Sequence, residues 1–265
     1  ITPAMREGSG LVEFSKKYPE RYFDVAIAEQ HSVTFAAGLA KENKKPVVAI
    51  YSTFLQRAYD QLIHDVAVQN LDVTFALDRA GLVGEDGPTH SGNYDIAYLR
   101  CIPNVILMTP SSENETRLLL STAYNHKGPA AVRYPRGTGP NSSIDPTLES
   151  LEIGKARLVR EGNSSIVFLN FGALLDQAEI VSKEMDMTLI DMRFVKPLDE
   201  ELLCKYLNNA SMFLSLEDGS ISGGAGSAVQ EFCGRNNIII KSMLFGIPDE
   251  FINHASREQM LDHAE

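Results

Sequence analysis

The sequence has few cysteines, little positive charge and no long apolar runs. Its three cysteines, Cys101, Cys204 and Cys233, form no C-x-x-C pair, and an odd number of unpaired cysteines is typical of a reducing compartment. The 24 Lys and Arg residues against 35 Asp and Glu give a net charge of −11, which argues against nonspecific binding to nucleic acid or to an acidic membrane. No apolar run reaches the ~18–20 residues that cross a bilayer.

Several familiar catalytic motifs are also missing. There is no G-x-x-x-x-G-K-[ST] phosphate loop, no G-x-S-x-G elbow, no H-x-x-x-H pair and no carboxylate cluster, so the sequence predicts no metal site of its own. The glycine-rich stretch 223–227 does not match G-x-G-x-x-G, and we interpret it as a turn that enters a helix. The chain opens with Ile1 and shows no secretory signal pattern, so we expect it to be cut from a longer chain.

Strand and helix patterns alternate along the whole sequence. This alternation predicts an α/β protein of two doubly wound domains with largely parallel sheets. We expect a first domain over 1–138, a linker rich in Pro, Gly and Ser over 139–152, and a second domain over 153–265. The predicted strands are 22–27, 47–50, 73–77, 105–108, 130–134, 165–171, 188–191, 212–216 and 238–243. The predicted helices are about 28–43, 54–69, 174–185, 199–208 and 224–234, and the stretch 109–115 opens a further one.

Local signals refine this outline. Ser52 or Thr53 is expected to cap the helix over 54–69, and Ser112 with Glu115 has the spacing of a capping box. Residues 78–94 are rich in Gly, Asp and Pro and have no periodicity. Long loops of this kind inside compact domains are often functional.

Residues able to do chemistry follow successive strands of the first domain. Glu29 follows the first predicted strand, and the segments 51–57, 78–90 and 133–137 follow the second, third and fifth. In a parallel sheet these carboxyl ends lie along one edge. Several arginines brought together in an otherwise acidic protein would suit a phosphate or a carboxylate.

Each of these residues also has a simpler interpretation. Glu29 could be only a favourable first-turn acid, a position worth about 0.3–1 kcal/mol. Phe54 could be part of the core, and Arg57 could pair with Asp60. His90 could bond the loop backbone, and Arg79 could pair with its neighbour Asp78. Their coincidence at successive strand ends is harder to attribute to chance.

The same stretches carry a family resemblance. The chain resembles the 1-deoxy-D-xylulose-5-phosphate synthases, thiamine-diphosphate enzymes of the transketolase group, in collinear order over nearly its whole length. The Ala-Glu-Gln-His and Tyr-Ser-Thr-Phe-Leu-Gln-Arg forms distinguish this family from transketolase proper and from pyruvate dehydrogenase β subunits. The matching segments are 24–31, 51–61, 78–81, 86–90, 100–103, 133–137 and 192–199.

The resemblance implies the second and third of three family domains, the transketolase pyrimidine-binding and C-terminal domains. The first family domain, which binds the cofactor's diphosphate and Mg²⁺, has no match, so we expect this chain alone to be inactive or nearly so. Two departures from the family pattern occur. Ser91 stands where a second His is common, and Asp218-Gly219 replaces a usual Glu-Asn.

The resemblance also implies roles for individual residues. Glu29 and His90 would be catalytic, and Glu29 and Phe54 would bind thiamine diphosphate by a hydrogen bond to its aminopyrimidine and by stacking. The substrate-binding residues would be Tyr51, Arg57, Arg79, Asp86, His90 and Arg136. Within this set, Arg79 and Arg136 would hold the phosphate of glyceraldehyde 3-phosphate, and His90 would bond the adduct derived from pyruvate.

The implied activity is that of a transketolase-type transferase. It would condense pyruvate with glyceraldehyde 3-phosphate to 1-deoxy-D-xylulose 5-phosphate and carbon dioxide, in the methylerythritol phosphate pathway that feeds isoprenoid, thiamine and pyridoxal synthesis. A homodimer is expected, in the bacterial cytoplasm or the plastid stroma, without nucleic-acid or membrane partners. Two alternatives are a β-type subunit of a two-chain thiamine-diphosphate 2-oxo acid dehydrogenase and a non-catalytic assembly module.

Overall fold

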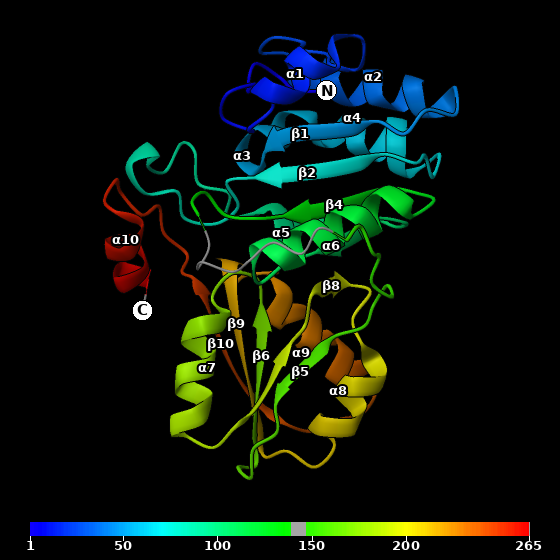
Figure 1. The fold of residues 1–265 in the computed structure, drawn as a ribbon. Coiled ribbons are helices and arrows are strands. Elements are labelled where there is room, and N and C mark those ends of the chain that lie inside the picture. The colour runs from blue at the N-terminus through cyan, green and yellow to red at the C-terminus, as the bar shows by residue number, and fades with distance from the viewer. Residues whose placement is uncertain (139–146, 265) are drawn as a thin grey trace.

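The computed structural model describes residues 1–138 and 147–264, which form two α/β domains stacked one on the other (Figure 1). Each domain contains a five-stranded sheet with mostly parallel pairs, in the orders β1-β2-β4-β3-β8 and β10-β9-β6-β7-β5. The predicted fold class is confirmed. Most of the predicted linker, residues 139–146, lies outside the described residues.

The first sheet takes four parallel strands from the first half of the chain and one antiparallel strand from the second half. Its strands are β1 (Val47–Tyr51), β2 (Thr74–Asp78), β3 (Ile106–Met108), β4 (Ala130–Arg133) and β8 (Phe194–Lys196). The first four lie within a residue or two of the predicted ranges. Strand β8 was not predicted, and it pairs with β3 through Leu107–Lys196 and Met108–Phe194, so the two halves of the chain share one sheet.

The predicted strand 22–27 is wrong. Only one isolated bridge, between Thr2 and Asp24, forms there. Positive φ at Ala26 (57°) interrupts the extended backbone, and among the described residues no strand pairs with this range. The apolar side chains that suggested burial are instead exposed, Phe23 by 39% and Ile27 by 76%.

The predicted helix 54–69 exists but begins earlier and changes pitch along its length. It consists of α3 (Ser52–Leu55), the 3₁₀ turn η2 (Gln56–Ala58), α4 (Tyr59–Gln61) and the π-helical turn η3 (Leu62–Ala67). The face predicted to be buried is fully buried, at Leu55, Ala58, Leu62 and Val66. Neither predicted cap forms, because Ser52 donates to Asp95 and Thr53 donates to the carbonyl of Thr89.

Four regular helices and two short turns complete the first domain. They are α1 (Val12–Lys17), η1 (Pro19–Arg21), α2 (Glu29–Lys41), η4 (Gly84–Asp86), α5 (Asp95–Arg100) and α6 (Glu113–Asn125). Half of the expected capping box forms at α6, where Ser112 accepts from the amide of Glu115 at 3.2 Å. The Glu115 carboxylate turns to the second half of the chain and binds Arg193 with two bonds of 2.7 and 2.8 Å.

The second domain is a sheet with helices on both faces. Its strands are β5 (Arg157–Arg160), β6 (Ile166–Phe171), β7 (Thr188–Asp191), β9 (Met212–Ser220) and β10 (Lys241–Ile247). Its helices are α7 (Leu175–Glu184), α8 (Glu200–Leu207), α9 (Ala225–Arg235) and α10 (Arg257–Ala264). Helix α7 packs on one face, whereas α8 and α9 pack on the other and join the main core. Among the described residues no helix is both long and apolar enough to cross a membrane.

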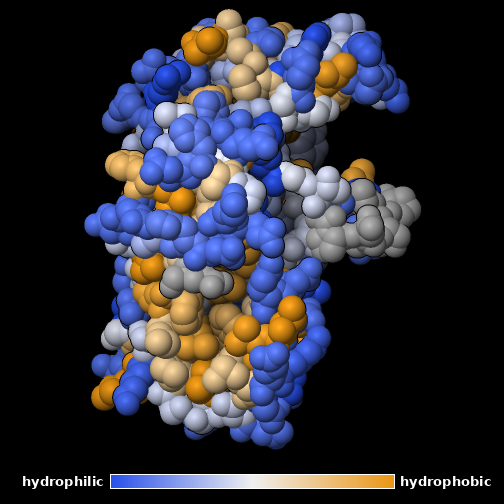
Figure 2. Space-filling view, turned by 90° about the vertical axis from the view of Figure 1, so that its left-hand side faces the viewer, coloured by the Kyte–Doolittle hydropathy of each residue, from blue (hydrophilic) through white to orange (hydrophobic). Residues whose placement is uncertain are grey.

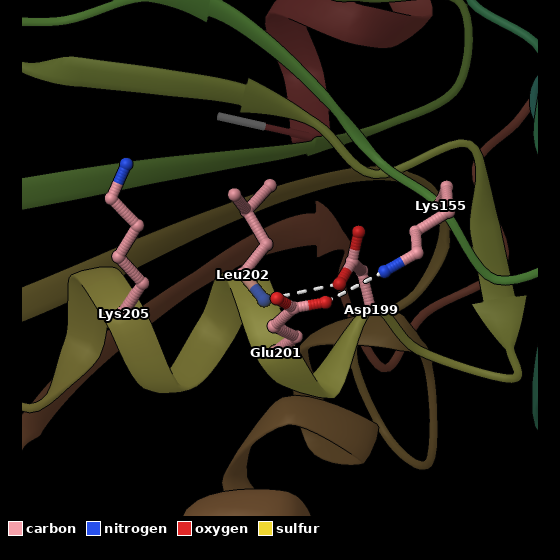
Figure 3. Close-up of a pocket in the computed structure, with 5 residues that line it drawn as sticks. All are labelled: Lys155, Asp199, Glu201, Leu202 and Lys205. Atoms are coloured by element: carbon pink, nitrogen blue, oxygen red, sulfur yellow. Dashed lines mark hydrogen bonds and ion pairs between the residues drawn. The ribbon is translucent and has the colours of Figure 1, made fainter.

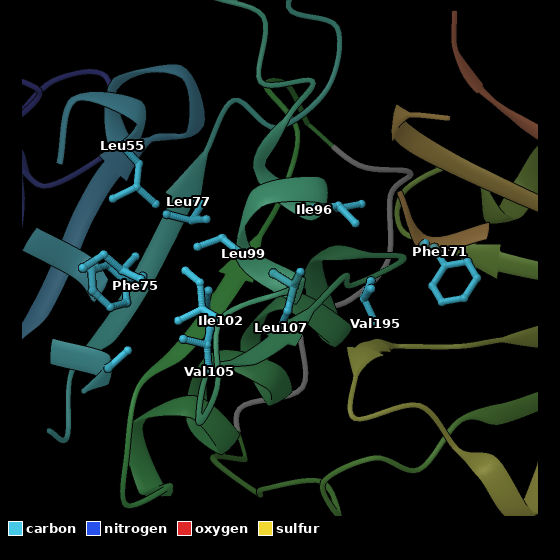
Figure 4. Packing of buried hydrophobic residues seen from close by; sticks show 14 of the residues in the cluster. Leu55, Phe75, Leu77, Ile96, Leu99, Ile102, Val105, Leu107, Phe171 and Val195 are labelled. Carbon is cyan, nitrogen blue, oxygen red and sulfur yellow. The ribbon is translucent and has the colours of Figure 1, made fainter. Parts of the chain in front are cut away.

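One hydrophobic core runs through both domains. Phe75 and Leu107 of the first sheet belong to the same buried cluster as Val195 and Phe171. Figure 4 shows this continuity from the first sheet to Phe171 at the end of β6. Apolar burial contributes about 25 cal/mol per Å², so this shared core fixes the position of one domain on the other.

Candidate active site

The candidate site lies at the carboxyl ends of β1, β2 and β4. Register pairs Tyr51 with Asp78 and Leu77 with Arg133, so the segments after these strands start side by side. The topology therefore brings the predicted residues after β1, β2 and β4 to one edge, as expected from the parallel sheet.

Aromatic side chains form the centre of this edge. Tyr51 and Phe54 are stacked, with ring centroids 5.2 Å apart and an angle of 11°. His90 meets Phe54 edge-on at 5.6 Å, and the Arg79 guanidinium lies 3.9 Å from the centre of the Tyr51 ring. Burial raises the pKa of Tyr51. Four residues from two segments, 51–57 and 78–90, thus form one continuous stack.

Charged groups border this stack. Asp86 lies between two guanidiniums, 3.1 Å from Nη1 of Arg136 and 3.9 Å from Nε of Arg79. Arg79 also binds the Asp78 carboxylate at 3.1 Å. Burial raises the pKa of Asp78, although the charge of Arg79 opposes that rise. Two arginines and two acids therefore form a charge-balanced cluster in which planar guanidiniums are positioned to bind an oxyanion.

The N-terminal segment contributes a contact that the sequence did not reveal. The carbonyl of Gly8 accepts from Nη1 of Arg79 at 3.2 Å, and a Cβ on Gly8 would lie 1.9 Å from the Tyr51 hydroxyl. Gly8 and Arg79 are 71 positions apart in the sequence. No local sequence pattern connects them, so the contact could not be predicted.

Glu29 is the buried first residue of α2, and it does not end a strand as expected. Its Oε1 accepts from Nη1 of Arg57 at 3.0 Å, while the Arg57 side chain stays 63% exposed. This contact excludes the simpler interpretation in which Arg57 pairs with Asp60, which instead faces His64 at 2.8 Å. Ile27, two residues before Glu29, is exposed and is a further candidate site residue. The sequence had placed it in a predicted buried strand.

The predicted residues thus fall into two groups. Glu29 and Arg57 form one, and Tyr51, Phe54, Arg79, Asp86, His90 and Arg136 form the other. Within residues 1–138 and 147–264 no recorded hydrogen bond or ion pair joins the two groups. The segment from β1 through η2, which carries Tyr51, Phe54 and Arg57, links them covalently.

Arg133 is not part of the site, although its motif suggested it. Its side chain is 3% exposed, and Nε lies 2.9 Å from both carboxylate oxygens of fully buried Asp95. Its Nη2 donates to the carbonyl of Asp218 at 2.6 Å. Arg133 therefore ties β4 to the second domain, which leaves Arg79 and Arg136 as the arginines that border the aromatic stack.

Other hollows and clusters do not coincide with these residues. A pocket of about 390 Å³ in the second domain is lined by Lys155, Asp199, Glu201, Leu202 and Lys205. Figure 3 shows Lys155 bonded to Glu201 and Asp199 capping α8, whereas Lys205 stands apart from these groups. The described part of the chain contains no group of three His, Cys, Asp or Glu side chains able to hold a metal ion.

Comparison with known proteins identifies the architecture. Residues 1–141 match the transketolase pyrimidine-binding domain. The chain belongs to the transketolase family. Residues 154–265 match the transketolase C-terminal domain. A solved structure described as a split-gene transketolase in an inactive β4 tetramer superposes on this chain with a TM-score of 0.86 at 25% sequence identity. The superposition covers 100% of this chain and 86% of the solved chain.

Several curated relatives of this transketolase-family chain carry one name. This chain is 62% identical over 261 residues to 1-deoxy-D-xylulose-5-phosphate synthase of Pseudomonas syringae pv. syringae. It is 60% identical over 260 residues to the enzyme of the same name from Hahella chejuensis. Each comparison covers 98% of this chain. The chain spans 41% and 40% of the length of these two relatives.

Proposed function

We propose that this chain supplies the pyrimidine-binding and substrate-phosphate parts of a 1-deoxy-D-xylulose-5-phosphate synthase. The reaction would be the decarboxylative condensation of pyruvate with glyceraldehyde 3-phosphate. The observation that carries the proposal is buried Glu29, held by Arg57, which lies in the same segment 51–57 as the Tyr51–Phe54 stack. Synthase names on relatives 60–62% identical support this activity over that of a 2-oxo acid dehydrogenase subunit or an assembly module.

The residues near Glu29 fit an aminopyrimidine. Oε1 of Glu29 is bound by Arg57, and no donor to Oε2 is recorded among the described residues, so the carboxylate can accept a further hydrogen bond. Half-buried Phe54 and exposed Ile27 supply apolar contact area for a ring. When bound, thiamine diphosphate supplies the nucleophilic carbon and the electron sink that decarboxylation needs. Glu29 would hold and exchange a proton at the pyrimidine nitrogen, in the orientation fixed by Arg57.

The second group of residues suits the two substrates. Arg79 and Arg136 would bind the phosphate of glyceraldehyde 3-phosphate as charge-assisted donors, with Tyr51 and Asp86 completing that network. Asp86 already contacts both guanidiniums, so it would orient them toward the substrate. His90, edge-on to Phe54, would donate a hydrogen bond to an oxygen derived from pyruvate.

Catalysis by this chain would need a domain that binds the diphosphate and Mg²⁺. We expect the 265 residues alone to show no turnover with pyruvate, glyceraldehyde 3-phosphate, thiamine diphosphate and Mg²⁺. Fusing the corresponding domain of the Pseudomonas syringae synthase to this chain should restore product formation. Robust turnover without that domain would refute the claim that this chain needs another domain to bind the diphosphate and Mg²⁺. No turnover with a folded fused partner would refute the synthase activity.

A second candidate is a separate β-type subunit that works with an independent chain. The similarity to the solved split-gene transketolase chain, of which this chain covers 86%, favours this arrangement. The two candidates predict different outcomes in the same experiment. A separate subunit should bind the diphosphate-binding domain and reach full activity when the two are mixed, whereas a piece of one polypeptide should reach it only in the fused form.

Self-association is part of the proposal. Large apolar side chains are exposed on α7, at Ile180, Val181 and Met185, and on β10, at Met243 and Phe245. Figure 2 shows hydrophobic residues gathered on the lower half of the face it displays, over the second domain. Light scattering coupled to gel filtration should report a homodimer, and a monomer at micromolar concentration would contradict it.

The bacterial relatives support a cytoplasmic location over the plastid stroma.

A further inference from the structure

The loop 79–94, which carries Asp86 and His90, has little internal structure to hold its shape. Its own elements are the short turn η4 and one bridge at its neck, where Gly81 and Gly92 exchange two backbone bonds of 2.8 Å. Fixing the backbone of each loop residue in one conformation has an entropic cost. A loop this long therefore needs external contacts to stay in one conformation.

The second domain supplies such a contact at the neck. Gly81 has φ of +71°, and a Cβ there would lie 1.9 Å from Oδ1 of Asp218. That oxygen accepts from the amide of Leu82 at 3.4 Å, and the Asp218 side chain is 3% exposed. A buried carboxylate is thus inserted against the loop where only glycine leaves room.

The C-terminal segment 248–264 holds Asp218 and covers the outer part of the loop. Nη2 of Arg257, the first residue of α10, binds Oδ2 of Asp218 at 3.0 Å. A small apolar cluster joins the loop to this segment through Leu82, Ile252 and Met260, all buried. Helix α10 also contacts η4, the turn that ends in Asp86.

The contact with the segment reaches the candidate site through Gly87. A Cβ on Gly87 would lie 2.6 Å from Cδ2 of His254, so the His254 ring packs directly on the backbone between Asp86 and His90. The carbonyl of Gly87 accepts from the amide of His90 at 3.1 Å. A shift of the segment would therefore move His90 relative to Phe54, and Asp86 relative to Arg136.

We propose that segment 248–264 is a strap that sets the position of the site loop, with Arg257 and Asp218 as positioning residues. The effect on substrate binding rests on the proposed function, whereas the effect on the loop does not. Neither residue touches Arg79, Arg136 or Glu29 in the described structure. Their contribution passes through the loop, and it should change how well the phosphate is bound more than how fast bound substrates react.

Hydrogen–deuterium exchange on the 265-residue chain tests the strap itself. In Arg257→Met, peptides covering 82–91 should exchange about tenfold faster, since a charge-assisted bond to a buried carboxylate is lost. Arg257→Lys should recover part of the protection. Arg235→Met, which removes an exposed pair with Glu200 at 3.5 Å, is the matched control and should leave the loop unchanged. Unaltered exchange over 82–91 in a folded Arg257→Met chain would overturn the proposal.

Kinetics of the enzyme complemented with the diphosphate-binding domain test the consequence. Arg257→Met should raise KM for glyceraldehyde 3-phosphate by about tenfold while kcat changes less than about twofold, and Arg257→Lys should restore most of the loss. A fall in kcat at constant KM would refute the positioning role. If the unmutated complemented enzyme has no activity, the proposed function fails, and the exchange experiment still decides the strap. If Arg257→Met does not fold, Asp218→Asn replaces it in both measurements.

Discussion

Replacing Arg133 should reveal how strongly the two domains are coupled. In Arg133→Met, the Asp95 carboxylate loses both bonds of 2.9 Å to Nε and stays fully buried, with Ser52 at 3.0 Å and the amide of Ile96 at 2.8 Å as its remaining donors. Breaking one side of a buried ion pair costs about 3–5 kcal/mol. The carbonyl of Asp218 also loses its donor from β4, so the loss extends to the second domain.

That cost is large against a total stability of about 5–15 kcal/mol for a folded protein. Urea unfolding of the 265-residue chain, followed by circular dichroism, should show the free energy of unfolding reduced by about 3–5 kcal/mol. The double variant Arg133→Met with Asp95→Asn should recover at least half of the loss, because no unpaired charge remains. Arg235→Met is the control, and an exposed pair of this kind should cost less than about 1 kcal/mol. A loss below about 1 kcal/mol in Arg133→Met would refute the assignment of Arg133 as the link between domains.

Three further expectations can be measured. Burial raises the pKa of Glu217 from 4.5 to about 7, so the folded chain keeps that proton longer than the unfolded chain, and the free energy of unfolding should fall by roughly 3 kcal/mol as the pH rises between these values and then level off. Urea titrations of Glu217→Gln across that range should lack this slope, and an unchanged slope would exclude Glu217 as its source. In the complemented enzyme, Glu29→Gln should lower kcat by about 100-fold or more, and a rate within a factor of about three would favour a non-catalytic role. Arg79→Met and Arg136→Met should each raise KM for glyceraldehyde 3-phosphate by at least about tenfold with little change in KM for pyruvate, since a charge-assisted phosphate contact is removed; equal effects on both substrates would count against phosphate binding.

Most of the parallel strands can be predicted from the sequence, because a strand buried on both faces appears as a short run of apolar residues. Strands β1, β2, β4 and β6 were found in this way. Strand β8 was missed because it has three residues and pairs with a partner almost 90 positions away. The range 22–27 has the composition of a strand, but burial depends on neighbours, and the fold leaves Phe23 and Ile27 exposed there.

The site could be predicted only as far as topology determines it. Tyr51, Arg79 and Arg136 lie together because β1, β2 and β4 are adjacent and parallel, so that their carboxyl ends share one edge of the sheet. Arg133 was grouped with them since it also follows a buried run, yet its side chain turns inward to Asp95, and sequence spacing carries no sign of that direction. The Glu29–Arg57 pair depends on the irregular pitch of 52–67, which propensities do not encode.

Strand β8 has a practical consequence for dissecting this protein. A truncated chain that stops at residue 152 would carry every loop of the candidate site but would lack Phe194, which is fully buried against Met108, Leu119 and Val132. The outer side of β3 would then be an unpaired edge, and such edges promote aggregation. Insolubility of that shorter chain would therefore reflect a missing strand rather than a domain unable to fold, and adding residues 187–198 back as a peptide should restore solubility.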